Sequence, residues 1–454
     1  MEQNTLFKGS PVPPEELKLS SVKGPRARIS SRKLLIGVII FFILLFAFIR
    51  FVLPLFISVV GFNKVTITYW GLWQNENVMK GVIDEFQKKN PNIKVEYTEQ
   101  DKNQYRKRLV TRINNGTGPD VFRFHNTWVP MLSGVLLPLP SNIINPGAFQ
   151  GNYYPVIQHD LMKNGAIYGI PLEIDTLALF VNTKMLKEAG YEVPDTWDEF
   201  REVATALTVR EGGEIKVAGA AMGTTKNVTH APDIISVLLV QNGVDLYNIK
   251  GSLTKVDEAL TFYNSFLGRR IWDLDLDPSV RAFAEEKLVM YFGFSWDVFT
   301  ILSINKNVPF EIYPVPHLPE GRNMTIASYW VEGVSVGSQH QREALKFIQF
   351  LSERETSIKF FTESSKTRPI GEPYARMDLA DSLRDNPLAY PFVMQAPNAV
   401  SSFFASDTYD EGLNDEMNQY LENAVNSFGS FSADTAAEGL ANGVSEVLKQ
   451  YGQR

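Results

Sequence analysis

The chain of 454 residues contains no cysteine. This absence excludes disulfide bonds, thiolate metal sites, a cysteine nucleophile and a lipid-acylated cysteine. Histidine is scarce as well, and its five residues show no metal-ligand spacing. No GxSxG, HExxH, Walker A or GxGxxG motif lies in the strand-and-helix context that its chemistry needs. We therefore expect no enzymatic activity, no catalytic residues, no metal and no cofactor.

Charge is nearly missing from one segment, the apolar run of residues 34–62, whose only charged residue is Arg50. About 20 helical residues cross a bilayer, so the run is long enough to span one. The residues before it are rich in lysine and arginine, which predicts a cytoplasmic leader over residues 1–33. We predict a single transmembrane anchor over residues 34–60, with the large domain outside the plasma membrane. A cleaved signal peptide is the alternative, but no small-x-small cleavage site follows the run.

The distribution of charge limits the partners of the large domain. The first 62 residues carry eight Lys/Arg and three Asp/Glu, a net charge of +5 within a chain of −7, so the remainder carries −12. Such an acidic surface argues against nucleic acid and against adhesion to anionic lipid. Residues 64–454 are numerous enough for two domains.

Strand and helix patterns alternate along this large domain. Residues 64–73 alternate β-branched and aromatic side chains like a strand, residues 75–91 place apolar side chains on one helical face, and residues 93–99 again resemble a strand. Thr196 and Glu199 form a capping-box pattern, which predicts a helix from Trp197 to Leu207. The alternation predicts parallel βαβ units and an α/β fold.

An ordered series of short segments resembles the extracellular solute-binding proteins of ABC importers, in the sugar-binding family that includes maltose-binding protein. The segments are GTGPDVF, GVLLPL, AIYGIP, LFVNTKMLKEAG, PDTWDEF, AEEKLVMYFGFSW and EGVSVGSQHQREALKFIQFLS. The resemblance implies a periplasmic-binding-protein-like fold, with two α/β lobes, a hinge and a ligand cleft. We expect one lobe from residues 64–174 and 334–378, and the other from residues 180–325 and 385–454.

Candidate ligand-binding residues follow the predicted strands, because ligands of open α/β sheets bind beyond the carboxyl ends of strands. Sugars need flat aromatic faces and groups that hydrogen-bond to hydroxyls. The candidates are Trp73, Gln74, Asn126, Trp128, Asp175, His230, Trp296, Trp330 and Tyr409. The resemblance implies that Asn126 and Asp175 hold family positions for a sugar-binding carboxylate, with an amide at Asn126, and that Trp296 stacks on sugar. His230 is left open between a site wall and a buried core histidine.

Together with the predicted anchor, the resemblance implies a membrane-anchored, monomeric ectodomain that captures a carbohydrate, expected to be an oligosaccharide, and delivers it to an ABC transporter permease. Two alternatives stay open at this point. The same fold can serve as a sensor or scavenging module without import, and a similar aromatic cleft can belong to a surface glycoside-active enzyme.

Overall fold

The computed structural model describes residues 31–52, 64–319, 323–427 and 433–453. The chain divides into two units, residues 1–63 and 64–454. In the first unit, α1 (Ser31–Ala47) continues into a short π-helix, η1 (Phe48–Val52). The predicted span of residues 34–60 is thus described only as far as residue 52. Among the described residues, no helix combines the length and the apolar character that a membrane crossing requires.

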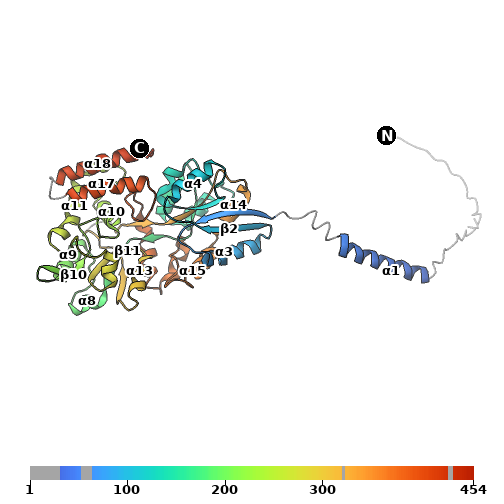
Figure 1. The fold of residues 1–454 in the computed structure, drawn as a ribbon, viewed down its shortest axis with the longest axis horizontal. Helices are drawn as coiled ribbons and strands as arrows, with labels where there is room; N and C mark the ends of the chain where they lie inside the picture. The colour runs from blue at the N-terminus through green and yellow to red at the C-terminus, as the bar shows by residue number, and fades with distance from the viewer. Residues whose placement is uncertain (1–30, 53–63, 320–322, 428–432, 454) are drawn as a thin grey trace, which may run out of the picture. The chain divides into compact units, whose positions relative to one another are not determined.

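The second unit contains two five-stranded sheets, each covered by helices (Figure 1). The first sheet has the order β2-β1-β3-β14-β6. Its strands are β1 (Val65–Gly71), β2 (Ile93–Glu99), β3 (Val121–His125), β6 (Ile170–Pro171) and β14 (Trp330–Val334). β1 runs parallel to β2 and β3, whereas β14 is antiparallel to β3 and β6. The helices around this sheet include α3 (Glu76–Lys89), α4 (Tyr105–Asn114), α14 (Gln341–Leu351) and α15 (Arg354–Ser364).

The second sheet has the order β12-β8-β11-β10-β9. Its strands are β8 (Ala178–Asn182), β9 (Val209–Glu211), β10 (Glu214–Ala220), β11 (Leu288–Gly293) and β12 (Phe310–Tyr313). Only β10 and β11 are parallel; the other three pairs are antiparallel. The expectation of parallel units is therefore right for part of each sheet and wrong for the rest, because later strands return in the opposite direction and pair with β3 and β8.

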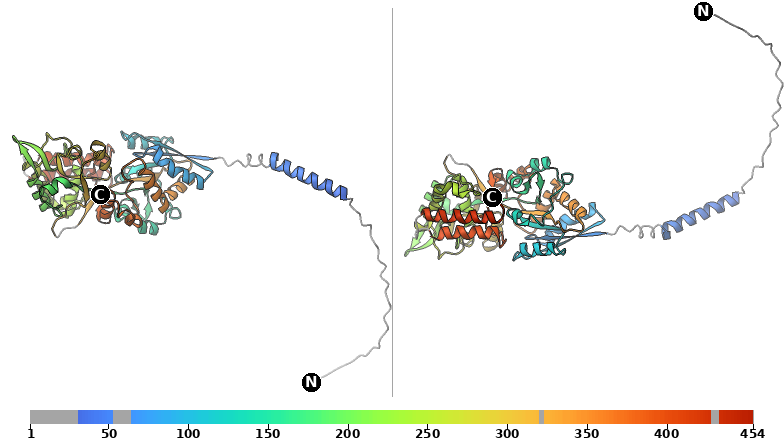
Figure 2. Two further views of the ribbon diagram at one scale, coloured as in Figure 1. Left: turned by 90° about the horizontal axis from the view of Figure 1, so that it is seen from below. Right: turned by 90° about the horizontal axis from the view of Figure 1, so that it is seen from above.

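Helices of the second sheet include α9 (Trp197–Ala206), α10 (Ala231–Gln241), α11 (Leu253–Gly268), α17 (Leu413–Ser427) and α18 (Ala433–Gln450). The predicted capping box of α9 is confirmed, because Thr196 and Glu199 each bond the other's backbone N–H. The C-terminal helices α17 and α18 pack together beside α11 on this lobe (Figure 2). The remaining α-helices in the described part of the chain are α5 (Val129–Leu132), α6 (Pro146–Asn152), α7 (Pro155–Leu161), α8 (Thr183–Glu188), α12 (Ser279–Ala284), α13 (Asp297–Ile304) and α16 (Tyr390–Gln395).

Three short strands lie where the chain passes between the two lobes. β7 (Asp175–Thr176), β13 (Thr325–Ser328) and β15 (Ala399–Val400) form a small sheet of their own, in the order β15-β13-β7. β7 comes just before β8 of the second sheet, and β13 comes just before β14 of the first. β4 (Met162–Lys163) and β5 (Ala166–Ile167) form a separate two-stranded antiparallel hairpin. The numerical lobe boundaries given above stay a prediction.

Candidate functional site

A cavity of about 440 Å³ lies where the loops of both lobes meet the crossing segments. Six of the nine candidate residues line it. They are Trp73, Gln74, Asp175, Trp296, Trp330 and Tyr409. Trp73 and Gln74 follow β1 of the first sheet, and Trp296 follows β11 of the second. Residues that follow strand ends in two different sheets therefore meet at one cavity, as expected for ligand groups in α/β folds.

Aromatic side chains form much of the cavity wall. The Trp73 ring lies 5.6 Å from the Trp330 ring and 5.7 Å from the Tyr409 ring, measured between centroids. The Trp296 ring is stacked on Phe294 at 4.4 Å. Phe294 therefore covers one face of Trp296, and the half-buried indole keeps its other face for the cavity. This arrangement suits a ligand with flat C–H surfaces.

The cavity is also a place of backbone strain. Trp73, Asp407 and Tyr409 line it with positive φ angles of 72°, 56° and 52°. A non-glycine residue in this region costs about 1–3 kcal/mol and persists where the surrounding structure imposes it, often at ligand sites. The Lys102 ammonium lies 3.9 Å from the centre of the Tyr409 ring and 5.5 Å from the Trp73 ring. These cation–π contacts help to hold both aromatic side chains in place.

A buried ionic network lies beside the cavity. The Arg123 Nε donates to Glu332 Oε1 at 2.6 Å, and its Nη1 donates to the Gln74 side-chain oxygen. Gln74 in turn donates to Glu372 Oε1 at 2.9 Å. Burial opposes the charge of Arg123, but Glu332 and Glu173 outweigh that effect and raise its pKa. Both the oxygen and the nitrogen of the Gln74 side-chain amide are therefore held by hydrogen bonds.

Asp175 joins the crossing strand β7 to the loop that carries Trp296. Its Oδ2 accepts hydrogen bonds from the backbone N–H of Ser295, at 2.9 Å, and from the Ser295 hydroxyl. Its Oδ1 accepts from the backbone N–H of Thr176 at 2.9 Å. Burial raises the pKa of Asp175, and the Ser295 hydrogen bonds offset part of that shift. Asp175 therefore has a structural role in addition to its place in the cavity wall.

Two other candidates, Trp128 and His230, support the cavity from behind without lining it. Trp128 is fully buried and contacts the Trp330 ring edge-to-face at 5.4 Å. His230 is also fully buried, and its Nε2 lies 2.8 Å from Asp297 Oδ2. Burial lowers the pKa of His230, but Asp297 and two further carboxylates outweigh this effect and raise it to about 9. The protonated imidazole thereby orients Asp297, which does line the cavity.

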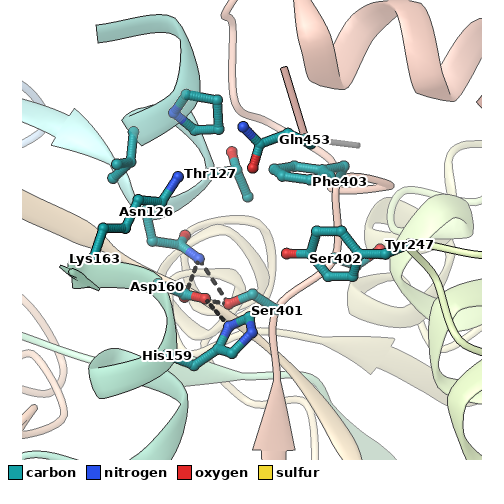
Figure 3. A pocket seen from close by; sticks show the side chains of 12 residues that line it. Asn126, Thr127, His159, Asp160, Lys163, Tyr247, Ser401, Ser402, Phe403 and Gln453 are labelled. Atoms are coloured by element: carbon teal, nitrogen blue, oxygen red, sulfur yellow. Dashed lines mark hydrogen bonds and ion pairs between the residues drawn. The ribbon is translucent and has the colours of Figure 1, made fainter. Parts of the chain in front are cut away.

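The ninth candidate, Asn126, lies elsewhere. It lines a second cavity of about 250 Å³ (Figure 3). Tyr329 separates the two cavities, because it lines the first and its hydroxyl donates to Asp160, which lines the second. The sequence correctly placed Asn126 after the strand β3, but it did not predict that the Asn126 side chain faces the second cavity.

Besides Asp297, four charged cavity residues are absent from the sequence-based candidates: Glu173, Arg368, Glu372 and Asp407. Glu173 follows the strand β6 closely and carries the same strand-end signal as Asp175. Arg368 and Glu372 follow the helix α15, where no strand pattern draws attention to them. With Asp175 and Asp297, the cavity wall holds five carboxylates and one guanidinium.

The wall offers hydrogen-bonding groups and aromatic surfaces. Residues 333–337 match the letters GxSxG, but Ser335 is buried at the end of β14 and its hydroxyl accepts from the Gly337 N–H. Within the described part of the chain, no group of three or more His, Asp or Glu residues is placed to hold a metal ion. The geometry fits a binding cleft.

Comparisons with known proteins agree with this description. The family model described as bacterial extracellular solute-binding protein matches residues 73–357. The multiple sugar-binding protein of Streptococcus mutans is 24% identical over 391 residues, covering 79% of this chain and 90% of that protein.

Solved structures share the fold. The sugar-binding protein MalE of Xanthomonas citri superposes with a TM-score of 0.69 at 22% identity, covering 86% of this chain and 98% of that one. A cyclo/maltodextrin-binding protein complexed with maltotetraose gives a TM-score of 0.70 at 17% identity, covering 85% and 97%. Two α/β lobes in the arrangement of periplasmic binding proteins are therefore the fold of the large domain.

Proposed function

We infer the function of this chain from its family, because it belongs to the bacterial extracellular solute-binding proteins. We propose that its large domain captures a carbohydrate between the two lobes and delivers it to the permease of an ABC importer. The observation that supports a sugar best is the cavity wall, in which Trp73, Trp296, Trp330 and Tyr409 accompany carboxylates and an amide. Aromatic faces take the C–H surface of a sugar ring, and the polar groups take its hydroxyls.

The charge of the wall favours a neutral ligand over an anionic one. Five carboxylates and one guanidinium line the cavity, and the guanidinium of Arg368 already donates to Glu372 and to the backbone oxygen of Trp73. A phosphodiester or carboxylate ligand would meet like charges in a partly desolvated site, which is costly. The names of the relatives agree, since they include a multiple sugar-binding protein and a protein complexed with maltotetraose.

Calorimetric titration of the full-length chain in detergent tests this proposal. Malto-oligosaccharides of increasing length are compared with a sugar phosphate of the same ring. Saturable binding of a neutral sugar with no hydrolysis product supports the proposal, and preferential binding of the phosphate contradicts it. Loss of uptake of the bound sugar when the gene is deleted would support delivery to a permease.

We further propose that the N-terminal unit anchors a monomeric large domain on the outer side of the plasma membrane. In support, residues 34–47 of α1 hold no charged or polar side chain, so this stretch of the helix is apolar on all its faces. Arg50 follows within η1, where its long side chain can reach the interface.

The absence of cysteine allows a direct test of topology, because one introduced cysteine is the only thiol. A membrane-impermeant maleimide applied to intact cells should label Lys94→Cys in the large domain and leave Ser10→Cys in the leader unlabelled. Labelling of both, or a mature chain that begins after residue 62, would contradict the anchor.

A further inference from the structure

Asp160, in α7, is the centre of a hydrogen-bonded cluster beside the second cavity (Figure 3). Its Oδ2 accepts from the Asn126 Nδ2 at 3.0 Å, from the Tyr329 hydroxyl at 2.7 Å and from the Ser401 hydroxyl. Three donors converging on one oxygen is the environment of an ionised carboxylate. His159 lies 3.2 Å from the other oxygen, measured from its Nδ1.

Asn126 uses its backbone N–H and both polar atoms of its side-chain amide in this cluster. Its backbone N–H donates to the backbone carbonyl oxygen of Tyr329 at 3.0 Å, and its Oδ1 accepts from the backbone N–H of Tyr329 at 3.3 Å. Its Nδ2 donates both to Asp160 and to Ser401, the latter at 2.9 Å. An aspartate at this position would lose both donors and place a second carboxylate against Asp160. The amide at position 126 is therefore explained by Asp160.

The cluster links residues at the first lobe to residues of the segments that cross between the lobes. A change in the angle between the lobes therefore has to move or break these hydrogen bonds. Asn126 follows β3, and Asp160 belongs to α7, which packs against the turn Asn126–Trp128 after β3 and against the crossing strand β15. Tyr329 lies between β13 and β14, and Ser401 follows β15, so these two belong to the crossing segments. Tyr329 also lines the first cavity, so its position affects the ligand site directly.

We propose that Asn126 and Asp160 form a hinge lock, which sets the angle between the lobes from behind the ligand cavity. Asn126 is then a positioning residue that acts through Tyr329 and does not touch the solute. Its effect on ligand affinity rests on the proposed function, whereas its effect on the lobe angle does not.

The first test measures the lobe angle without ligand. Spin labels on Lys80→Cys, in α3, and Glu214→Cys, in β10, report one interlobe distance, because the chain has no other thiol. We expect Asn126→Asp to shift and broaden this distance distribution, because two carboxylates then face each other. The double variant Asn126→Asp with Asp160→Asn should restore it, since donor and acceptor are exchanged.

A matched control and a milder variant keep the test decisive. Asn307→Asp makes the same chemical change at an exposed side chain and should leave the distance unchanged. Ser401→Ala removes one donor to Asp160 and one acceptor of the Asn126 amide without adding a charge, and it serves if Asn126→Asp does not fold. An unchanged distance in both Asn126→Asp and Ser401→Ala, or failure of the double variant to restore it, overturns the hinge lock.

The second test measures affinity for the sugar identified by titration. We expect Asn126→Asp to weaken binding at least about tenfold, as expected when two carboxylates face each other in a partly buried site, and the double variant to recover most of the loss. Ser401→Ala should cost about three- to tenfold. If Asn126→Asp lowers affinity and the double variant does not recover it, Asn126 contacts the ligand and the proposal is wrong. If no sugar binds at all, the proposed function fails while the distance measurement still decides the hinge lock.

Discussion

Replacing Trp296 by alanine should remove a stacking surface for the sugar while leaving the fold intact. One face of the indole is covered by Phe294 at 4.4 Å, and the ring is only half buried. An aromatic side chain buries about 200 Å² when fully covered, and at most about a third of the indole is exposed, so the remaining face offers roughly 60 Å² to a ligand. At about 25 cal/mol per Å² this corresponds to about 1.5 kcal/mol of binding free energy. The dissociation constant should therefore rise about tenfold at 25 °C.

Titration calorimetry against the preferred sugar, together with thermal melting, measures both effects. Trp70→Ala is the matched control, because Trp70 is also half buried and packs on the core but does not line the cavity. The control should lower the melting temperature and leave affinity unchanged. Wild-type affinity in Trp296→Ala, or an equal loss of affinity in Trp70→Ala, would refute the stacking argument.

Two further predictions concern buried ionisable side chains. Asp175→Ala should lower both affinity and the free energy of unfolding, the latter by about 1–3 kcal/mol, because Ser295 loses the acceptor of its N–H. Chemical denaturation checks this against Asp381→Ala, which changes an exposed carboxylate, and equal stability of the two variants would contradict it. Because the folded-state pKa of His230 is raised from 6.5 to about 9 beside Asp297, its contribution to stability is complete below pH 6.5 and lost as the pH rises through 9. The free energy of unfolding should fall by about 3 kcal/mol over this pH range. His230→Gln should lack this pH dependence, and an equally steep fall in the variant and the unmodified chain would disprove the assignment.

Local patterns in the sequence were sufficient for many of the elements and for six of the nine candidate positions, which line the cavity. The capping box of α9 depends on Thr196 and Glu199 alone, so it could be recognised without tertiary information. Trp73 and Trp296 follow strands with clear apolar patterns, and the carboxyl ends of those strands meet at the cavity. The binding roles of these residues stay predictions.

Features that depend on distant partners could not be predicted. The pairing of β8 and β11 is antiparallel, and nothing in either strand's own residues gives its direction relative to the other. Asn126 was expected in the ligand cleft because it follows β3, but its side chain turns toward Asp160, 34 residues further along the chain. Arg368 reaches the cavity from the segment after α15, and only its three-dimensional position identifies it.

The same chain segments line both cavities and separate them, so a change at the second cavity can alter ligand affinity at the first. Ser401 lines the second cavity, Tyr409 lines the first, and Tyr329 separates them. When only a fraction of molecules holds the lobes at the binding-competent angle, the apparent dissociation constant is the intrinsic one divided by that fraction. A substitution beside the second cavity can therefore change affinity without altering any ligand contact. It does so by changing the fraction of competent molecules, which the interlobe distance reports, whereas Trp296→Ala should weaken binding at an unchanged distance.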